Sequence, residues 1–193
     1  MDKKLEKLFN DYHVVSCKML LENGYTKYQI MNLVKKGFLY RVRKGLYRLH
    51  NEIDDEFHIY QKNNSYIVYS NETALYLHNL TDRFPNPLRV TKKSGYHVRN
   101  KKLKVYYVKE EFLDNNVVIL NSPQGNPIYV YDIERTICDI VKNKNRMDPQ
   151  VYIQGLQNYF LRGKPNLRKL SKISKLLNIQ QKMMSIIELY VKP

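Results

Sequence analysis

The chain has 193 residues, of which 43% are hydrophobic and 12% aromatic, and its formal net charge is +15. This composition excludes a wholly disordered chain, and no run approaches the ~18 apolar residues that a membrane span needs. The N-terminus also lacks the apolar core of a signal peptide, so we expect a cytoplasmic protein that is attracted to polyanions and not to membranes.

The positive charge is concentrated at the two ends of the chain. Residues 1–50 contain eleven Lys and Arg against four Asp and Glu, and residues 142–193 contain eleven against two. Residues 51–141 contain eleven basic and twelve acidic residues. The pattern predicts two positive surfaces separated in sequence by a neutral region.

Three short helices are predicted in the first 37 residues. The first covers about residues 3–10, and the second begins at Ser16, which is a good N-cap residue, and ends at Asn23-Gly24. The third begins at Thr26, because Thr26 and Gln29 have the spacing of a capping box, and it ends near Gly37. Its Ile30, Leu33 and Val34 share one side, which leaves a polar outer face.

The segment GFLYRVRKGLYRLH, residues 37–50, predicts a β-hairpin with Lys44-Gly45 as its two-residue turn. This turn pairs Arg41 with Arg48 and places Arg41, Arg43 and Arg48 on one face, opposite a face that packs on the core. A pair of like charges destabilises a hairpin by up to about 1 kcal/mol. The arginines therefore favour an anionic partner, although an ordinary solvated hairpin would look the same.

The order of these elements is typical of a winged helix-turn-helix. In that fold the third helix enters the major groove, where Gln29 and Asn32 could read adenine edges, and the hairpin reaches phosphates. The residues expected to contact DNA are Lys27, Tyr28, Gln29, Asn32, Lys35, Lys36, Arg41, Arg43, Lys44 and Arg48. A protein-binding platform built from the same elements is the alternative.

A linker is predicted at residues 51–65, with a short helix over about 54–61, and we expect domains over 1–60 and 61–193. Ser70 can cap a helix that ends before two prolines, and His78 on this helix is expected to be structural. An extended piece over 88–91 and strands over 103–108, 117–121 and 127–131 predict a small, mostly antiparallel sheet. The predicted class is α+β, with several helices in the C-terminal domain.

Asp132 can cap a helix that runs to about Lys142 and carries Arg135 and Asp139 one turn apart, which predicts an internal ion pair. Three further helices are expected over 149–161, 166–177 and 179–191. The middle one is amphipathic and offers a possible second basic surface of Arg168, Lys169, Lys172 and Lys175. A basic helix face of this kind is usually just exposed to solvent, and a second nucleic-acid contact is the more specific hypothesis.

No pattern in the chain indicates catalysis. Known signatures of nucleophilic, phosphate-binding and zinc sites are missing, and Cys17 and Cys138 lie far apart in apolar contexts that predict core thiols. We therefore expect no enzymatic activity, no catalytic residue, no metal and no cofactor. Two alternatives remain open, namely a nuclease whose scattered acids converge in the fold, and a protein-interaction module without sequence-specific DNA binding.

Three segments together resemble the AbiEi-type antitoxin and transcriptional regulator family. They are GFLYRVRKGLYRL, SNETALYLHNLTD (residues 70–82) and VYDIERTICDIV (residues 130–141), with Asn79 at a position where relatives frequently have Gly. The resemblance implies a winged helix that represses its own operon by binding promoter inverted repeats. It also implies a C-terminal domain that counteracts a nucleotidyltransferase toxin without a stable complex, in a type IV toxin-antitoxin system that acts in abortive infection and phage defence.

Overall fold

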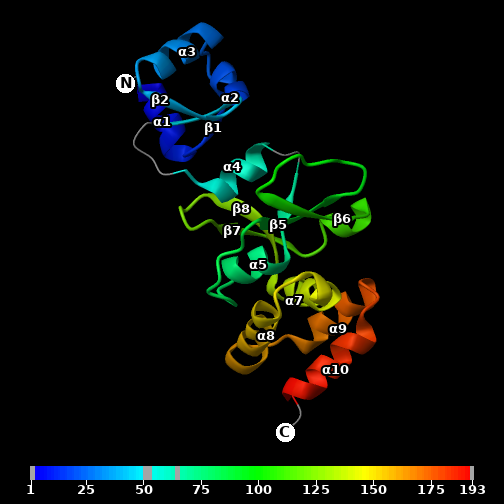
Figure 1. The fold of residues 1–193 in the computed structure, drawn as a ribbon. Coiled ribbons are helices and arrows are strands. Elements are labelled where there is room, and N and C mark those ends of the chain that lie inside the picture. The colour runs from blue at the N-terminus through cyan, green and yellow to red at the C-terminus, as the bar shows by residue number, and fades with distance from the viewer. Residues whose placement is uncertain (1–2, 50–53, 64–65, 192–193) are drawn as a thin grey trace. The chain divides into compact units, whose positions relative to one another are not determined.

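The structure is a computed structural model that describes residues 3–49, 54–63 and 66–191. It divides into two compact units, which we call unit 1 (Met1–Tyr66 and Asn121–Ile128) and unit 2 (Ile67–Leu120 and Tyr129–Pro193). Both units contain helices and strands (Figure 1), so the predicted α+β class is confirmed.

Unit 1 begins with helices and strands in the order α1 (Lys3–Asp11), β1 (Val15–Ser16), α2 (Cys17–Glu22), α3 (Lys27–Lys35), β2 (Leu39–Arg43) and β3 (Leu46–Leu49). The strands form a three-stranded sheet in the order β1-β3-β2. The N-terminal strand β1 was not predicted, because two residues are too few to show an alternating pattern. Helix α4 (Glu56–Asn63) follows the hairpin.

Local capping signals account for the starts of α2 and α3. Ser16 Oγ accepts a hydrogen bond from the Met19 amide, and Thr26 and Gln29 form the predicted reciprocal capping box. The three helices then bury one face each in a common core with the hairpin, which comprises Leu5, Leu8, Phe9, Val15, Leu20, Ile30, Leu39 and Tyr47. The predicted helices and their inward faces are thus confirmed.

The hairpin has the predicted turn but not the predicted register. Arg43 pairs with Leu46 across the turn, and a β-bulge between Arg41 and Arg43 then moves Arg41 opposite Tyr47. Arg48 therefore pairs with Tyr40 instead of Arg41, and the predicted like-charge pair does not form. An extra residue in one strand turns the side chains that follow to the other face, so the single arginine face was a wrong prediction.

A turn from far along the sequence belongs to unit 1. The Asp55 carboxylate, which precedes α4, accepts hydrogen bonds from the Ser122 hydroxyl and from the side-chain amide of Asn126. The same carboxylate accepts a bond from the His58 amide at the start of α4. Residues 121–128 thereby join unit 1, whereas the sequence placed the whole of 61–193 in a second domain.

Unit 2 contains a five-stranded sheet in the order β6-β5-β4-β8-β7 and a helical region. Its strands and first helices are β4 (Val68–Tyr69), α5 (Asn71–Leu77), β5 (Leu88–Lys93), β6 (Leu103–Val108), α6 (Glu110–Leu113), β7 (Val117–Asn121) and β8 (Pro127–Tyr131). The helical region comprises α7 (Ile133–Lys142), the 3-10 turn η1 (Lys144–Arg146), α8 (Pro149–Gln157), the π-turn η2 (Asn158–Arg162), α9 (Leu167–Leu176) and α10 (Gln180–Val191).

The sheet is mixed, and the predicted mostly antiparallel arrangement is wrong. β4 pairs antiparallel with β5, but β4 with β8 and β5 with β6 are parallel. The β5–β6 pair extends from Leu88 opposite Leu103 to Lys93 opposite Val108. The connection between these strands contains no helix, whereas parallel strands are usually joined by a crossover of a dozen or more residues. Nine extended residues span about 30 Å, however, which is enough to run back along a strand of about 20 Å.

Helix α5 packs against both β5 and α7, and the helices α8, α9 and α10 lie beyond α7 (Figure 1). The largest core cluster joins Leu75 of α5 to apolar side chains of α7, α8, α9 and α10. Asn79, which follows α5, has φ +56°. This is a left-handed conformation that Gly favours and Asn tolerates. No helix in the described part of the chain is both long and apolar enough to cross a membrane.

Candidate nucleic-acid interface

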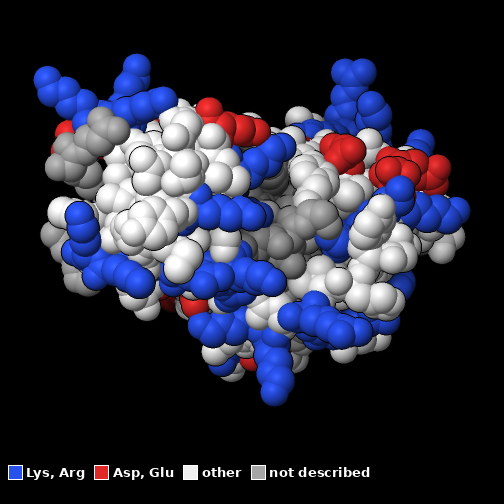
Figure 2. Space-filling model, turned by 90° about the horizontal axis from the view of Figure 1, so that it is seen from above, with Lys and Arg blue, Asp and Glu red and all other residues white. Residues whose placement is uncertain are grey.

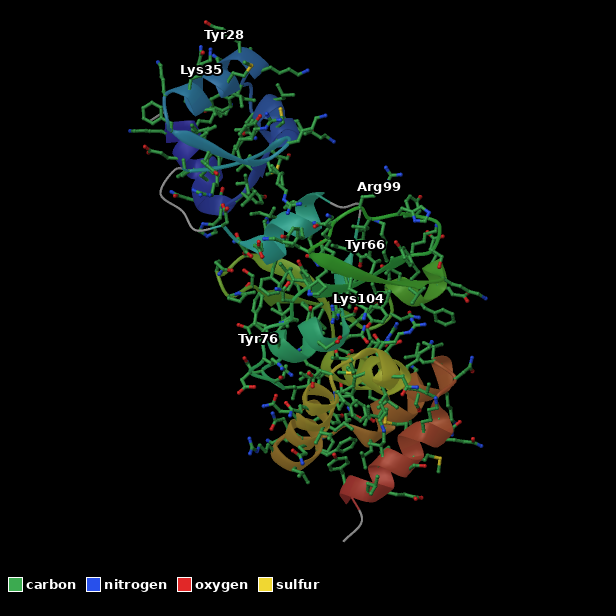
Figure 3. All side chains as sticks on the ribbon, viewed as in Figure 1. Tyr28, Lys35, Tyr66, Tyr76, Arg99 and Lys104 are labelled. Carbon is green, nitrogen blue, oxygen red and sulfur yellow. The ribbon has the colours of Figure 1, made fainter. Side chains whose placement is uncertain are left out.

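The outer face of α3 is formed by large and basic side chains. Tyr28 is 73% exposed and Met31 is 58% exposed. Lys35, one turn after Met31, is also exposed and lies on the same face of the helix. Tyr28 and Lys35 are labelled on α3 in Figure 3. Ile30 is buried on the opposite side, which fixes the rotation of the helix about its axis. Lys27 and Lys36 are exposed at the two ends of this helix, and Asn32 is half-buried.

The structure gives Gln29 a capping role. Its Oε1 accepts a hydrogen bond of 2.8 Å from the Thr26 amide. The Gln29 side chain is therefore held against the helix end, and its carbonyl oxygen is already used. Asn32 is not part of this cap, whereas reading of a base by Gln29 would require the capping box to open.

The basic residues of the hairpin fall into two groups. Arg41 and Lys44 are exposed, and neither forms an ion pair with any described residue. Arg48 donates a hydrogen bond of 2.6 Å from Nε to Asp54 and lies over the Tyr40 ring at 4.5 Å, with its side chain only 13% exposed. The Arg43 guanidinium lies over the Tyr60 ring at 4.5 Å. Arg43 and Arg48 thus stabilise unit 1, and Arg41 and Lys44 are the hairpin cations open to a ligand.

Acidic side chains are missing from this part of the sequence. Residues 23–51 contain seven Lys and Arg and no Asp or Glu. Blue Lys and Arg side chains cover clearly more of the face shown in Figure 2 than red Asp and Glu side chains. Except for Arg48, which pairs with Asp54, the cations of α3 and the hairpin form no ion pair with any described residue, which favours binding to a phosphate backbone.

Helix α9 carries three of the four residues of the expected second basic surface on its exposed side. Arg168, Lys172 and Lys175 are exposed. Lys169 instead forms ion pairs of 2.9 Å with both Asp132 and Glu134 at the N-terminal end of α7. These carboxylates help to hold the pKa of Lys169 above its usual value, although burial opposes the rise. Lys169 therefore joins α9 to α7 and does not belong to the surface.

Sequence reasoning missed some exposed residues of both units. Met31 was passed over because an apolar residue is expected to be buried, although its spacing from Tyr28 and Lys35 puts it on their face. The connection between β5 and β6 also exposes Tyr96, which is 53% exposed, together with Arg99, labelled in Figure 3. Its basic residues Arg99, Lys101 and Lys102, close to Tyr96, were the available signal.

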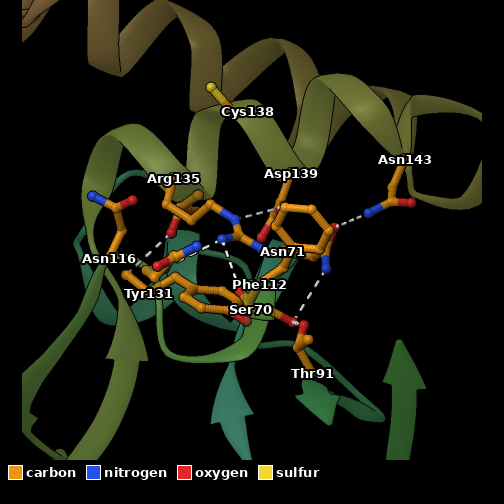
Figure 4. Close-up of polar contacts among 12 residues, drawn as sticks. Ser70, Asn71, Thr91, Phe112, Asn116, Tyr131, Arg135, Cys138, Asp139 and Asn143 are labelled. Atoms are coloured by element: carbon orange, nitrogen blue, oxygen red, sulfur yellow. Dashed lines mark hydrogen bonds and ion pairs between the residues drawn. The ribbon is translucent and has the colours of Figure 1, made fainter. Parts of the chain in front are cut away.

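A buried polar network surrounds Arg135 on α7 (Figure 4). The Arg135 side chain is 1% exposed and pairs with Asp139 at 3.1 Å, as the sequence predicted. It also donates to the carbonyl oxygens of Phe112 and Asn115 and lies over the Tyr131 ring at 4.2 Å. Burial raises the pKa of Asp139, and Arg135 opposes this rise.

Three other residues are of types that can take part in chemistry, namely His78, Cys138 and Cys17. His78 Nε2 lies 2.7 Å from the Tyr131 carbonyl oxygen, and burial lowers the pKa of His78. Cys138 is buried and Cys17 half-buried, both as free thiols. Burial raises the pKa of Cys138, which makes its thiolate inaccessible to chemistry. The described residues include no group of three or more His, Cys, Asp or Glu that could hold a metal ion.

The fold is similar to that of the RV2827C protein from Mycobacterium tuberculosis, a crystal structure with which it shares a TM-score of 0.65. The two sequences are 11% identical, and the match covers 97% of this chain and 77% of that chain. The similarity therefore concerns the fold alone. No protein-family model and no curated protein matches this chain.

Proposed function

We propose that this protein is a DNA-binding transcriptional regulator whose first 49 residues form a winged helix-turn-helix. The observation that carries the proposal is that a helix with an exposed outer face is followed by a hairpin with exposed cations. On α3 the exposed residues are Tyr28, Met31 and Lys35. On the hairpin, Arg41 and Lys44 are exposed and form no ion pair with any described residue. The order α1-β1-α2-α3-β2-β3 supports it, because a winged helix has these elements in this order.

In this proposal α3 lies in the major groove and the hairpin contacts the backbone. Tyr28 and Met31 can contact the edges and methyl groups of bases, and Asn32 can bond to adenine. Lys35, Arg41 and Lys44 neutralise phosphates and release counterions. Two copies of the protein on inverted repeats would then repress the operon, and the exposed side of α9 is a possible further contact.

The test is a gel-shift titration with DNA from immediately upstream of the gene, against a scrambled duplex, at several salt concentrations. The variant Arg41→Ala/Lys44→Ala removes only exposed cations, so it leaves the contacts of Arg43 and Arg48 intact. The control Lys3→Ala/Lys7→Ala removes the same charge from exposed positions on α1. We expect the hairpin variant to reduce the slope of log K against log salt by about 2, because each phosphate contact contributes about 0.9.

Base reading is tested separately with Asn32→Ala. Loss of one bidentate contact to a base costs about 1–3 kcal/mol of discrimination. This variant should therefore bind the upstream DNA less tightly while its binding to scrambled DNA stays the same. Equal binding of the unmodified protein to both duplexes would contradict sequence-specific regulation and favour the protein-interaction module.

We further propose that unit 2 acts as an antitoxin against a nucleotidyltransferase toxin, without forming a stable complex. Support comes from the resemblance of the segments 37–49, 70–82 and 130–141 to the AbiEi-type family. The test is rescue of cells that express the partner toxin. Rescue by the variant Arg41→Ala/Lys44→Ala, after this variant has lost binding to the upstream DNA, is expected if the two roles are separate. Loss of rescue by this folded variant would contradict that separation.

A further inference from the structure

Unit 2 contains a cavity of about 550 Å³ between α7, β6 and the turn that follows α7. This volume lies within the ~300–1,000 Å³ range typical of pockets for small molecules. The cavity is independent of the proposed DNA interface, because all of its lining residues belong to unit 2. Its polar lining comes mainly from α7 and the residues that follow it, with Asn71, Thr91 and Tyr106 from α5, β5 and β6, and Val108 and Leu177 contribute apolar surface.

Two buried polar atoms at this cavity lack a partner. Asp139 uses Oδ1 for Arg135, while its Oδ2 has no hydrogen-bond partner among the described residues. The Asp139 side chain is only 8% exposed. The hydroxyl group of Tyr106, also in the lining, is buried and likewise has no partner in the described part of the chain. Buried polar groups in proteins are nearly always bonded, so these two atoms point to a missing ligand.

The charges around the cavity favour an anion. Arg135, Lys142 and Arg146 line it together with a single carboxylate, that of Asp139. Arg135 is neutralised by this carboxylate, but Lys142 and Arg146 are exposed and form no ion pair with any described residue. Lys142 is close enough to Asp139 to lower its pKa. A phosphate bound by Lys142 and Arg146 would therefore lie only a short distance from the Asp139 carboxylate.

The neighbouring group that suits Asp139 Oδ2 is a hydroxyl. A hydroxyl both donates and accepts, so it can bond to this carboxyl group in either protonation state. A phosphate with a hydroxyl-bearing ring beside it is the chemistry of a sugar phosphate. Val108, which faces the same side of β6 as Tyr106, and Leu177 offer apolar contact for a further planar ring.

We propose that this cavity is a binding site for a free mononucleotide. The phosphate contacts Lys142 and Arg146, a ribose hydroxyl donates to Asp139 Oδ2, and the base lies against Val108 and Leu177. The Tyr106 hydroxyl donates to an oxygen of the sugar phosphate. Asn143 and Asn145 add side-chain amides to the lining, and amides of this kind can bond to phosphate or base.

The experiment is isothermal titration calorimetry of the full chain with adenosine 5′-monophosphate. We expect saturable binding, with adenosine and inorganic phosphate each binding at least tenfold more weakly because each lacks part of the recognised group. 2′,3′-Dideoxyadenosine 5′-monophosphate, which retains the phosphate and the base, should also bind at least tenfold more weakly because it has no ribose hydroxyl for Asp139.

Variants separate the site from the general positive charge of the protein. Lys142→Gln/Arg146→Gln should weaken binding at least tenfold, and Tyr106→Phe, which removes only the hydroxyl, should weaken it by about threefold to tenfold. Arg162→Gln/Lys164→Gln removes the same charge at exposed positions outside the cavity and should leave the affinity unchanged. No saturable binding at millimolar nucleotide, equal weakening by both double variants, or equal affinity for the dideoxynucleotide would each overturn the proposal.

Discussion

Replacement of Arg135 by Met should destabilise unit 2 strongly, because this arginine is the centre of a buried network. Its guanidinium bonds to Asp139 at 3.1 Å and to the carbonyl oxygens of Phe112 and Asn115 at 3.3 and 3.2 Å. Arg135→Met leaves all three acceptors without this donor. Removal of one partner of a buried ion pair costs about 3–5 kcal/mol, so we expect a loss of that size in the free energy of unfolding.

The double variant Arg135→Met/Asp139→Leu tests this explanation more sharply than the single variant does. Replacement of both partners removes the uncompensated charge, so the double variant should lose at least ~2 kcal/mol less than the sum of Arg135→Met and Asp139→Leu. Urea denaturation followed by far-UV circular dichroism measures each free energy. Arg168→Met, at an exposed position of α9, is the control and should change stability by less than about 0.5 kcal/mol. Additive losses, or a loss under ~1 kcal/mol for Arg135→Met, would refute the reasoning.

Three further predictions follow from individual contacts. Thr26→Ala removes the hydroxyl that caps α3 and should lower the stability of unit 1 by about 1 kcal/mol in urea denaturation, whereas Thr26→Ser should not. Gly163→Ala places a Cβ 2.6 Å from the Tyr159 carbonyl oxygen and should cost about 1–3 kcal/mol, and an unchanged thermal midpoint would contradict that clash. The pKa of His78 is lowered by burial, so the unfolded chain takes up the proton first. Stability should therefore fall as the pH drops below ~6.5, and this dependence should be smaller in His78→Gln.

Much of the local structure was predictable because its causes lie within a few residues. The Thr26–Gln29 capping box, the Ser16 cap and the Lys44-Gly45 turn each depend on neighbouring residues, and each forms as expected. The i,i+4 pair of Arg135 and Asp139 was equally local. Helix periodicity also showed which side of α3 would be buried, so the exposed residues of the candidate interface followed from it, with the exception of Met31.

The tertiary structure decided which charged side chains remain open to a partner. Composition counts Arg43, Arg48 and Lys169 as part of two positive surfaces, but each is engaged by a residue outside its own helix or strand. These partners are Tyr60, Asp54 and the acidic start of α7. The parallel pairing of β5 with β6 and the capture of the 121–128 turn by Asp55 are non-local in the same way. Such pairings depend on which segments meet when the core closes. The cavity beside Asp139 could not be predicted from the sequence. It is lined by residues of segments far apart in the chain, and no local pattern shows that these segments meet in the fold.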